Sequence, residues 1–488
     1  MRLHVVERYH STAMRRMAEP LVQLLGATTS ADIDYEAMNI HVPWHFITGE
    51  TKGHHAIVYT HCNPGDEKKL EAACAMAEIV FCMSFQGRQE LLDLGVPIAK
   101  IWVAYPGSGD FLARRRNIGL VGYVQPNGRK REHILTDLAY LLDEHTKSML
   151  NFIATGANWQ DAVEEAKKAG LHAMMATEKT GHADDVDMNM LYQAMDALLV
   201  SGFIEGGPLP MLEALRTGAR VFAPNIGFAA DFLDERNKYK SVEDLAKLLT
   251  RWIQPTLQRM YLGHSFTWKA YVEEFAMALM PLTGESYLAE RGLPRYRQLL
   301  DIVEERKPKR ICEIGTWSGQ RALQMIQTAQ RHNEDIWYEG FDVFEESTPG
   351  LVRKEFSKEG YPMKTVEQRL KPTGAHIWLH QGVTSETLQT DYLRHKERAN
   401  LAGSTSFDIY FIDGGHSYET IANDWNWVAG NMDKDSVVIF DDYCTDGPEH
   451  YGCKPLVDSL GAEYKVEILP VVTEAANGKI QMVKVTRA

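Results

Sequence analysis

Short apolar runs alternate with longer amphipathic stretches along most of the chain. The apolar runs are typical of buried strands and lie at Ile57–Tyr59, Ile79–Cys82, Ile101–Ala104, Ile118–Val121, Asn151–Thr155, Ala197–Val200 and Ala219–Ala223. The stretches between them predict helices at Asp66–Ala77, Arg88–Leu94, Asp161–Ala169 and Leu209–Arg216. Because strands and helices alternate, we expect βαβ units and parallel sheets.

A third series of the same kind begins near Arg310 and continues to the end of the chain. Gly- and Pro-containing connectors separate the series at 105–109 and 280–285. A chain of 488 residues is also too long for one hydrophobic core. We therefore predict an α/β protein with three Rossmann-like domains, at residues 1–110, 111–282 and 283–488.

Composition and charge narrow the classes of function. The chain is 44% hydrophobic and 24% charged, as in ordinary globular proteins. Its net charge of −14 disfavours nucleic acid as a partner, because affinity for the phosphate backbone comes from Lys and Arg. The six cysteines form no CxxC pair, and neither a signal peptide nor a membrane-spanning run is evident, so we expect a cytoplasmic protein with reduced thiols. Homo-oligomerisation is left open.

Two glutamates eight positions apart mark the first candidate site. Glu205 falls in a Gly- and Pro-rich loop, and Glu213 falls in the first turns of the helix that follows. Carboxylates placed in this way can accept hydrogen bonds from sugar and ribose hydroxyls, and a helix N-terminus can help to bind a diphosphate. The alternative is a pair of ordinary surface glutamates.

The order of the surrounding segments resembles the retaining GT-B glycosyltransferases, the family with the E-x7-E motif. The resemblance covers residues 55–280 and includes the strand at Gly119–Gly122, the segment Tyr192–Ser201 before the glutamates, and the helix opened by 266–268. It implies a nucleotide-sugar donor. The chain departs from the pattern at Gly122-Tyr123, where the family often has Gly-Arg, and its N-terminal half is short.

The resemblance also implies roles for individual residues. Glu205 would contact the donor sugar, Glu213 the ribose of the nucleotide, and Arg129 and Lys130 the diphosphate. His61 stands where the family often keeps an active-site histidine near the acceptor, although it could equally be a loop histidine without a catalytic role.

A second candidate site begins at Glu313-Ile-Gly315-Thr-Trp-Ser-Gly319, which reads as the end of a strand, a glycine-rich turn and the start of a helix. Glycines let the backbone approach a ligand closely. Because G-x-G-x-x-G is absent, NAD is disfavoured. Asp342 ends the next strand and is placed to bind ribose hydroxyls, unless it only caps the strand.

Three more aspartates follow later strands. Asp413 ends the strand of residues 407–412, and Asp441 and Asp442 end the strand that begins at Val437. Carboxyl ends of parallel strands meet at one edge of a sheet, and converging carboxylates repel one another unless a hard cation lies between them. We therefore predict a Mg²⁺ site, the alternative being unrelated strand-end aspartates.

These segments resemble class I S-adenosylmethionine-dependent methyltransferases, over residues 295–450. The segment Ile412-Asp-Gly-Gly-His416-Ser-Tyr418 matches the branch that includes Mg²⁺-dependent sugar O-methyltransferases. The resemblance implies that Glu313, Gly315, Gly319 and Asp342 hold S-adenosylmethionine and that His416 is the general base. Some members use an aspartate two residues after the first metal ligand, where this chain has Gly415.

Three hypotheses of function remain. The first is a bifunctional enzyme that transfers a sugar from a nucleotide sugar to a glycan or glycoconjugate and O-methylates a sugar hydroxyl. The second keeps only the methyltransferase active and makes the GT-B part a glycan-binding module. The third has DNA as acceptor, which the acidic charge disfavours.

Overall fold

The computed structural model describes the chain except for residues 7–11, 48–51, 108–113, 125–130, 178–184, 203–208, 290–291, 348–349, 351–354, 356–359, 391–405, 446–450 and 476–477. Contacts divide the chain into two compact units, residues 1–109 with 261–488, and residues 110–260. The three predicted domains at 1–110, 111–282 and 283–488 remain a prediction.

The first sheet is parallel, with the strand order β2-β1-β3-β4-β5-β6. Strands β4 and β5, inside the sheet, are almost fully buried, which explains why they read as continuous apolar runs. The strands are β1 (Arg2–Val6), β2 (Thr28–Ser30), β3 (Ala37–His41), β4 (His54–Tyr59), β5 (Ile79–Cys82) and β6 (Ile101–Val103). The helices are α1 (Thr12–Leu25), η1 (Trp44–Phe46), α2 (Glu67–Met76), α3 (Phe85–Asp93) and η2 (Ile98–Lys100).

The second sheet, in the unit of residues 110–260, is also parallel and has the order β12-β11-β10-β7-β8-β9. In chain order this is the 3-2-1-4-5-6 arrangement of Rossmann folds, whose ligands bind where the order reverses, here between β7 and β10. The strands are β7 (Arg116–Val121), β8 (Leu150–Thr155), β9 (Ala173–Thr177), β10 (Ala197–Leu199), β11 (Arg220–Pro224) and β12 (Lys238–Tyr239). The helices are α4 (Ile134–Leu141), α5 (Glu144–Ser148), α6 (Gln160–Lys168), α7 (Asp185–Ala194), α8 (Leu209–Arg216), α9 (Gly227–Phe232), η3 (Glu235–Asn237) and α10 (Val242–Ser265).

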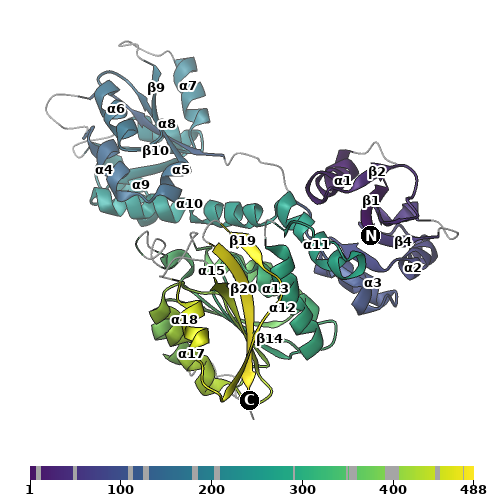
Figure 1. Cartoon of the computed structure of the whole chain (residues 1–488). Coiled ribbons are helices and arrows are strands. Elements are labelled where there is room, and N and C mark those ends of the chain that lie inside the picture. The colour runs from purple at the N-terminus through teal and green to yellow at the C-terminus, as the bar shows by residue number, and fades with distance from the viewer. Residues whose placement is uncertain are drawn as a thin grey trace. The chain divides into compact units, whose positions relative to one another are not determined.

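The third sheet has the order β15-β14-β13-β16-β17-β20-β18, in which β20 is antiparallel to both of its neighbours and β19 pairs only with β20. The strands are β13 (Arg310–Ile314), β14 (Trp337–Asp342), β15 (His376–Gln381), β16 (Ile409–Ile412), β17 (Val437–Cys444), β18 (Tyr464–Ile468), β19 (Thr473–Ala475) and β20 (Gly478–Arg487). Helices α12 and α13 cover one face of this sheet and α17 and α18 the other (Figure 1). The helices are α12 (Leu293–Arg306), α13 (Gln320–Ala329), η5 (Phe344–Glu346), α15 (Met363–Leu370), η6 (Lys371–Thr373), α17 (Tyr418–Asn431) and α18 (Cys453–Asp458).

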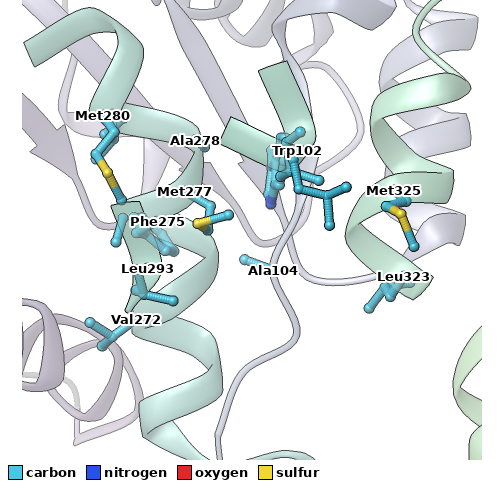
Figure 2. Close-up of a cluster of buried hydrophobic side chains, with 14 of the residues drawn as sticks. Trp102, Ala104, Val272, Phe275, Met277, Ala278, Met280, Leu293, Leu323 and Met325 are labelled. Atoms are coloured by element: carbon cyan, nitrogen blue, oxygen red, sulfur yellow. The ribbon is translucent and has the colours of Figure 1, made fainter. Parts of the chain in front are cut away.

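Helix α11 (Trp268–Thr283) packs against both the first and the third sheet regions. The ring of its Phe275 stacks on Phe81 of β5, with the centroids 3.7 Å apart. Figure 2 shows side chains of α11 gathered with Trp102 of β6, Leu293 of α12 and Leu323 of α13 in one apolar cluster. This shared core places α11 in the same compact unit as both sheets.

The predicted fold class is confirmed: the chain is α/β and consists of successive Rossmann-like sheets. The structure recovers the predicted strands and helices with shifts of a few residues at their ends. In the described part of the chain, no helix combines the length and the apolar character needed to cross a membrane.

Candidate active site

The register of the third sheet brings three predicted site residues to the same level. Ile314 of β13 pairs with Ile412 of β16, and Ile412 pairs with Phe440 of β17. Gly315, Asp413 and Asp441 are the next residues on these three adjacent strands, so they meet at the carboxyl edge of the sheet. The strand order reverses between β13 and β16, which is where α/β sheets bind ligands.

A bulge at the end of β17 presents two consecutive aspartates to this edge. The pairing of β17 with β20 changes register between Phe440 and Tyr443, and Asp442 adopts a left-handed backbone with φ of 57°. In a regular strand, consecutive side chains point to opposite faces. The irregular backbone instead allows both Asp441 and Asp442 to reach the same cation, Arg295.

The glycine-rich turn after β13 lies directly against the end of β16. Gly315 has φ of 97°, and a Cβ atom added there would lie 2.0 Å from the backbone oxygen of Asp413. Only glycine therefore permits this approach. Gly319 also has a positive φ, of 74°, and is the N-cap residue of α13, with Val366 nearest to the place of its missing Cβ.

A cavity of about 690 Å³ opens over this edge. This is the size range of small-molecule sites. Its walls include the predicted residues Glu313, Gly315, Asp342, Asp413, His416 and Asp442. Glu273 of helix α11 and Thr267, the residue just before this helix, also line the cavity.

His416 and Asp442 form a pair inside the cavity. His416 Nε2 lies 3.2 Å from Asp442 Oδ2, and its ring stacks on Tyr451 with the centroids 5.0 Å apart. Burial lowers the pKa of His416, but the hydrogen bond and charge of Asp442 outweigh it, so that the pKa is raised. Burial acts to raise the pKa of Asp442, whereas His416 and Arg295 lower it below its usual value.

Glu313 and Asp342 come from the two strands next to the glycine-rich turn: Glu313 lies in β13, just before the turn, and Asp342 ends β14. Burial raises the pKa of Glu313 to about 8, and Tyr338 donates a hydrogen bond to its Oε2. Asp342 accepts hydrogen bonds from the backbone N–H of Trp317 at 2.8 Å and of Phe344 at 2.7 Å. Asp342 therefore fixes the turn itself, and its carboxylate still lines the cavity.

Arg295, from the first turn of α12, faces the aspartates. Its Nη1 contacts Oδ1 of Asp441 and lies 3.4 Å from Oδ1 of Asp442. Among the described residues, no group of three or more His, Cys, Asp or Glu side chains is disposed to hold a metal ion. Carboxylates are the chemistry that Mg²⁺ prefers, but Asp413, Asp441 and Asp442 do not fit a Mg²⁺ ion in the arrangement seen here.

The predicted sugar-nucleotide residues are only partly described. Glu205, Arg129 and Lys130 lie outside the described residues. Glu213 lies on α8 and accepts a hydrogen bond of 2.6 Å from the hydroxyl of Tyr192, which is buried. In sequence, Arg129 and Lys130 follow β7, whereas Glu205 and Glu213 follow β10, so the two groups come after the strands on either side of the second sheet's switch point.

His61 lines a separate cavity of about 660 Å³ in the first sheet region, with Tyr59, Glu67 and Ser84 among its other walls. Its ring is exposed, and Nδ1 lies 3.1 Å from the hydroxyl of Thr60. Nothing in this cavity tests the predicted catalytic role of His61.

Sequence reasoning missed Arg295, Arg321 and Glu273 as parts of the site. Arg295 stands at the start of a helix whose residues Tyr296, Leu299 and Leu300 show helical apolar spacing, and no motif distinguishes it from a surface arginine. Its burial, with 6% of its surface exposed, is evident only from the structure.

Comparison with known families identifies the third sheet region. Residues 312–443, about a quarter of the chain, match a family described as a methyltransferase domain. This part of the chain is similar to that family. No curated protein matches the chain.

Several solved structures are similar to parts of the chain. The O-methyltransferase TomG of Streptomyces achromogenes, in complex with SAM, is 17% identical, with a TM-score of 0.30, over 44% of this chain and 89% of its own. An O-methyltransferase of Bacillus cereus in complex with SAH is 12% identical, with a TM-score of 0.27, over 40% and 81%. TarM of S. aureus, in complex with UDP and sugars, is 15% identical, with a TM-score of 0.24, over 54% of this chain and 58% of its own, so the match spans little more than half of TarM.

Proposed function

We propose that the chain is an S-adenosylmethionine-dependent O-methyltransferase that acts on a sugar hydroxyl, with His416 as general base. The observation that carries this proposal is one cavity at the switch point of a methyltransferase domain, which contains both the glycine-rich turn and the His416–Asp442 pair. The turn fits the donor, because Gly315 lines the cavity without a side chain and lets the turn lie directly against the backbone of Asp413. Glu313, Gly315 and Asp342 would hold the donor, with Gly319 starting the helix beneath it.

S-adenosylmethionine, when bound, supplies a methyl group on a positively charged sulfur. The protein must remove a proton from the acceptor hydroxyl, because a sugar hydroxyl is a very weak acid. The lowered pKa of Asp442 keeps this carboxylate ionised, so Nε2 of His416 carries the hydrogen that faces it. Nδ1 of His416 is then the atom that accepts the proton from the acceptor oxygen, and Asp442 stabilises the imidazolium that forms.

Replacement of the histidine tests this assignment. We expect His416→Ala in the full chain to lower the rate of methyl transfer to a panel of sugar acceptors by about 10²–10⁴-fold, the usual contribution of general-base catalysis. Calorimetry should show that the variant still binds S-adenosylmethionine. His376→Ala is the matched control, because His376 pairs with Asp335 at 2.9 Å but does not line the cavity. If the His416→Ala variant transfers methyl groups at a rate within a few-fold of the wild type, His416 is not the general base. If the wild type does not bind S-adenosylmethionine, the proposed function is wrong.

Glycosyl transfer from a nucleotide sugar is a second candidate function, for the parts of the chain that precede the methyltransferase domain. The 3-2-1-4-5-6 order of the second sheet favours it, since the predicted donor residues follow the strands at its switch point. Glu213→Ala should weaken nucleotide-sugar binding at least tenfold and leave methyl transfer unchanged. Glu165→Ala is the control, because Glu165 is an exposed glutamate on another helix, α6. Equal nucleotide-sugar binding by the two variants would contradict the role of Glu213, and absence of nucleotide release by the wild type would leave the first two sheets as a binding module.

A further inference from the structure

The aspartate pair at the end of β17 already has a positively charged partner within the chain. Arg295 contacts Asp441 and Asp442, and both Arg295 and Asp441 are buried, with exposed fractions of 6% and 3%. A buried charge without a partner is strongly unfavourable. In the arrangement seen here, the ion pair therefore compensates both the positive charge of Arg295 and the negative charge of the aspartates.

The start of α12 holds Arg295 in this position. The helix begins after Gly292, whose φ of 70° lies in the left-handed region. The guanidinium carbon lies 5.0 Å from the centroid of the Tyr296 ring, and that of Arg321 lies 3.9 Å from the same ring. Contact with this aromatic ring restricts where the Arg295 side chain can go.

The same carboxylates are those that the sequence predicts as ligands of Mg²⁺. Asp413, which follows the neighbouring strand β16, is half-buried and lines the same cavity as Asp442. Oδ2 of Asp441 is buried and accepts no hydrogen bond of good geometry from the described residues. The site thus contains carboxylate groups that could bind a cation, but Arg295 already forms an ion pair with Asp441.

We propose that Arg295 is the built-in counter-ion of Asp441 and Asp442, and that it competes with a divalent cation for these carboxylates. A guanidinium and a divalent ion held by the same buried carboxylate repel each other, and this repulsion is only weakly screened there, so Arg295 weakens the binding of such an ion. The inference deepens the proposed methyltransferase function, since it concerns the same cavity.

Binding of Mn²⁺ alone to the full chain, followed by electron paramagnetic resonance, tests the proposal without an activity assay. We expect the wild type to bind Mn²⁺ weakly and Arg295→Met to bind it at least tenfold more tightly. Asp441→Asn added to Arg295→Met should abolish the gain. Arg297→Met is the matched control and should bind as the wild type does, because Arg297 is also buried on α12 but pairs with Asp301 at 2.6 Å and with the backbone oxygen of Met277.

Equal Mn²⁺ affinity of the wild type and Arg295→Met, whether tight or weak, would overturn the proposal. Arg295→Lys provides a second comparison if the methionine variant does not fold. Its compact ammonium replaces the planar fork and should be displaced more easily, so tighter binding than wild type supports the proposal and equal binding overturns it. Calorimetry with S-adenosylmethionine on the same samples separates the counter-ion role of Arg295 from the proposed function. If the wild type does not bind S-adenosylmethionine, the proposed function is contradicted, whatever the Mn²⁺ result.

Discussion

At the scale of single residues, Glu313 is a buried carboxyl group at the edge of the proposed donor site. Only 1% of its surface is exposed, and burial raises its pKa to about 8. Near neutral pH this side chain is therefore largely protonated and uncharged. A ligand with a positive charge on sulfur favours the ionised form of a neighbouring carboxyl group.

We therefore expect S-adenosylmethionine binding to release a proton below pH 8. Because the bound state favours ionised Glu313, affinity should rise as the pH increases from 6 to about 8 and level off above it. Calorimetry in buffers of different ionisation enthalpy measures the proton directly. The demethylated product, which lacks the sulfonium charge, should show a smaller dependence. Glu313→Gln should show none, and a Glu313→Gln profile identical to that of wild type would assign the proton to another group.

At the scale of elements, periodicity predicted the strands that are buried on both faces, such as β5, because they are uninterrupted apolar runs. It did not predict β1 (Arg2–Val6), which lies inside the first sheet but contains a histidine. His4 is tolerated there because its ring nitrogens meet Thr28 at 2.8 Å and Ser30 at 3.1 Å. A local sequence pattern cannot show that a buried polar side chain finds hydrogen-bond partners among residues far away in the sequence.

The candidate site shows the same limit. Strand ends and glycines were sufficient to predict that Gly315, Asp413 and Asp441 approach one another, because parallel strands end at one edge. That both Asp441 and Asp442 reach Arg295 depends on the bulge and the left-handed backbone of Asp442, which strand alternation would not suggest. Arg295 comes from a helix 146 residues earlier, and only the tertiary structure connects it to Asp441.

At the scale of the whole molecule, α11 links the third sheet region to the first sheet. Glu274 of this helix accepts hydrogen bonds from the indole N–H of Trp102 in β6 and from the side-chain amide of Gln324 in α13, both at 2.8 Å. The backbone N–H of Val103 also bonds the side chain of Gln327 at 2.9 Å. Because Glu273, next to Glu274, lines the cavity of the candidate site, a fragment that starts at residue 285 would lack part of the wall of this cavity.

Phe275 and Phe222 allow this linkage to be tested, since both are completely buried but in different compact units. Phe275→Ala should destabilise its unit by about 3–5 kcal/mol, the usual cost of such a cavity. Because α11 packs on both sheets, amide hydrogen exchange should accelerate together in β4–β6 and in β13–β14, and remain unchanged in β7–β8. Phe222→Ala should produce the opposite pattern. Faster exchange confined to β4–β6 in the Phe275→Ala protein would show that the first sheet and the third sheet region unfold independently.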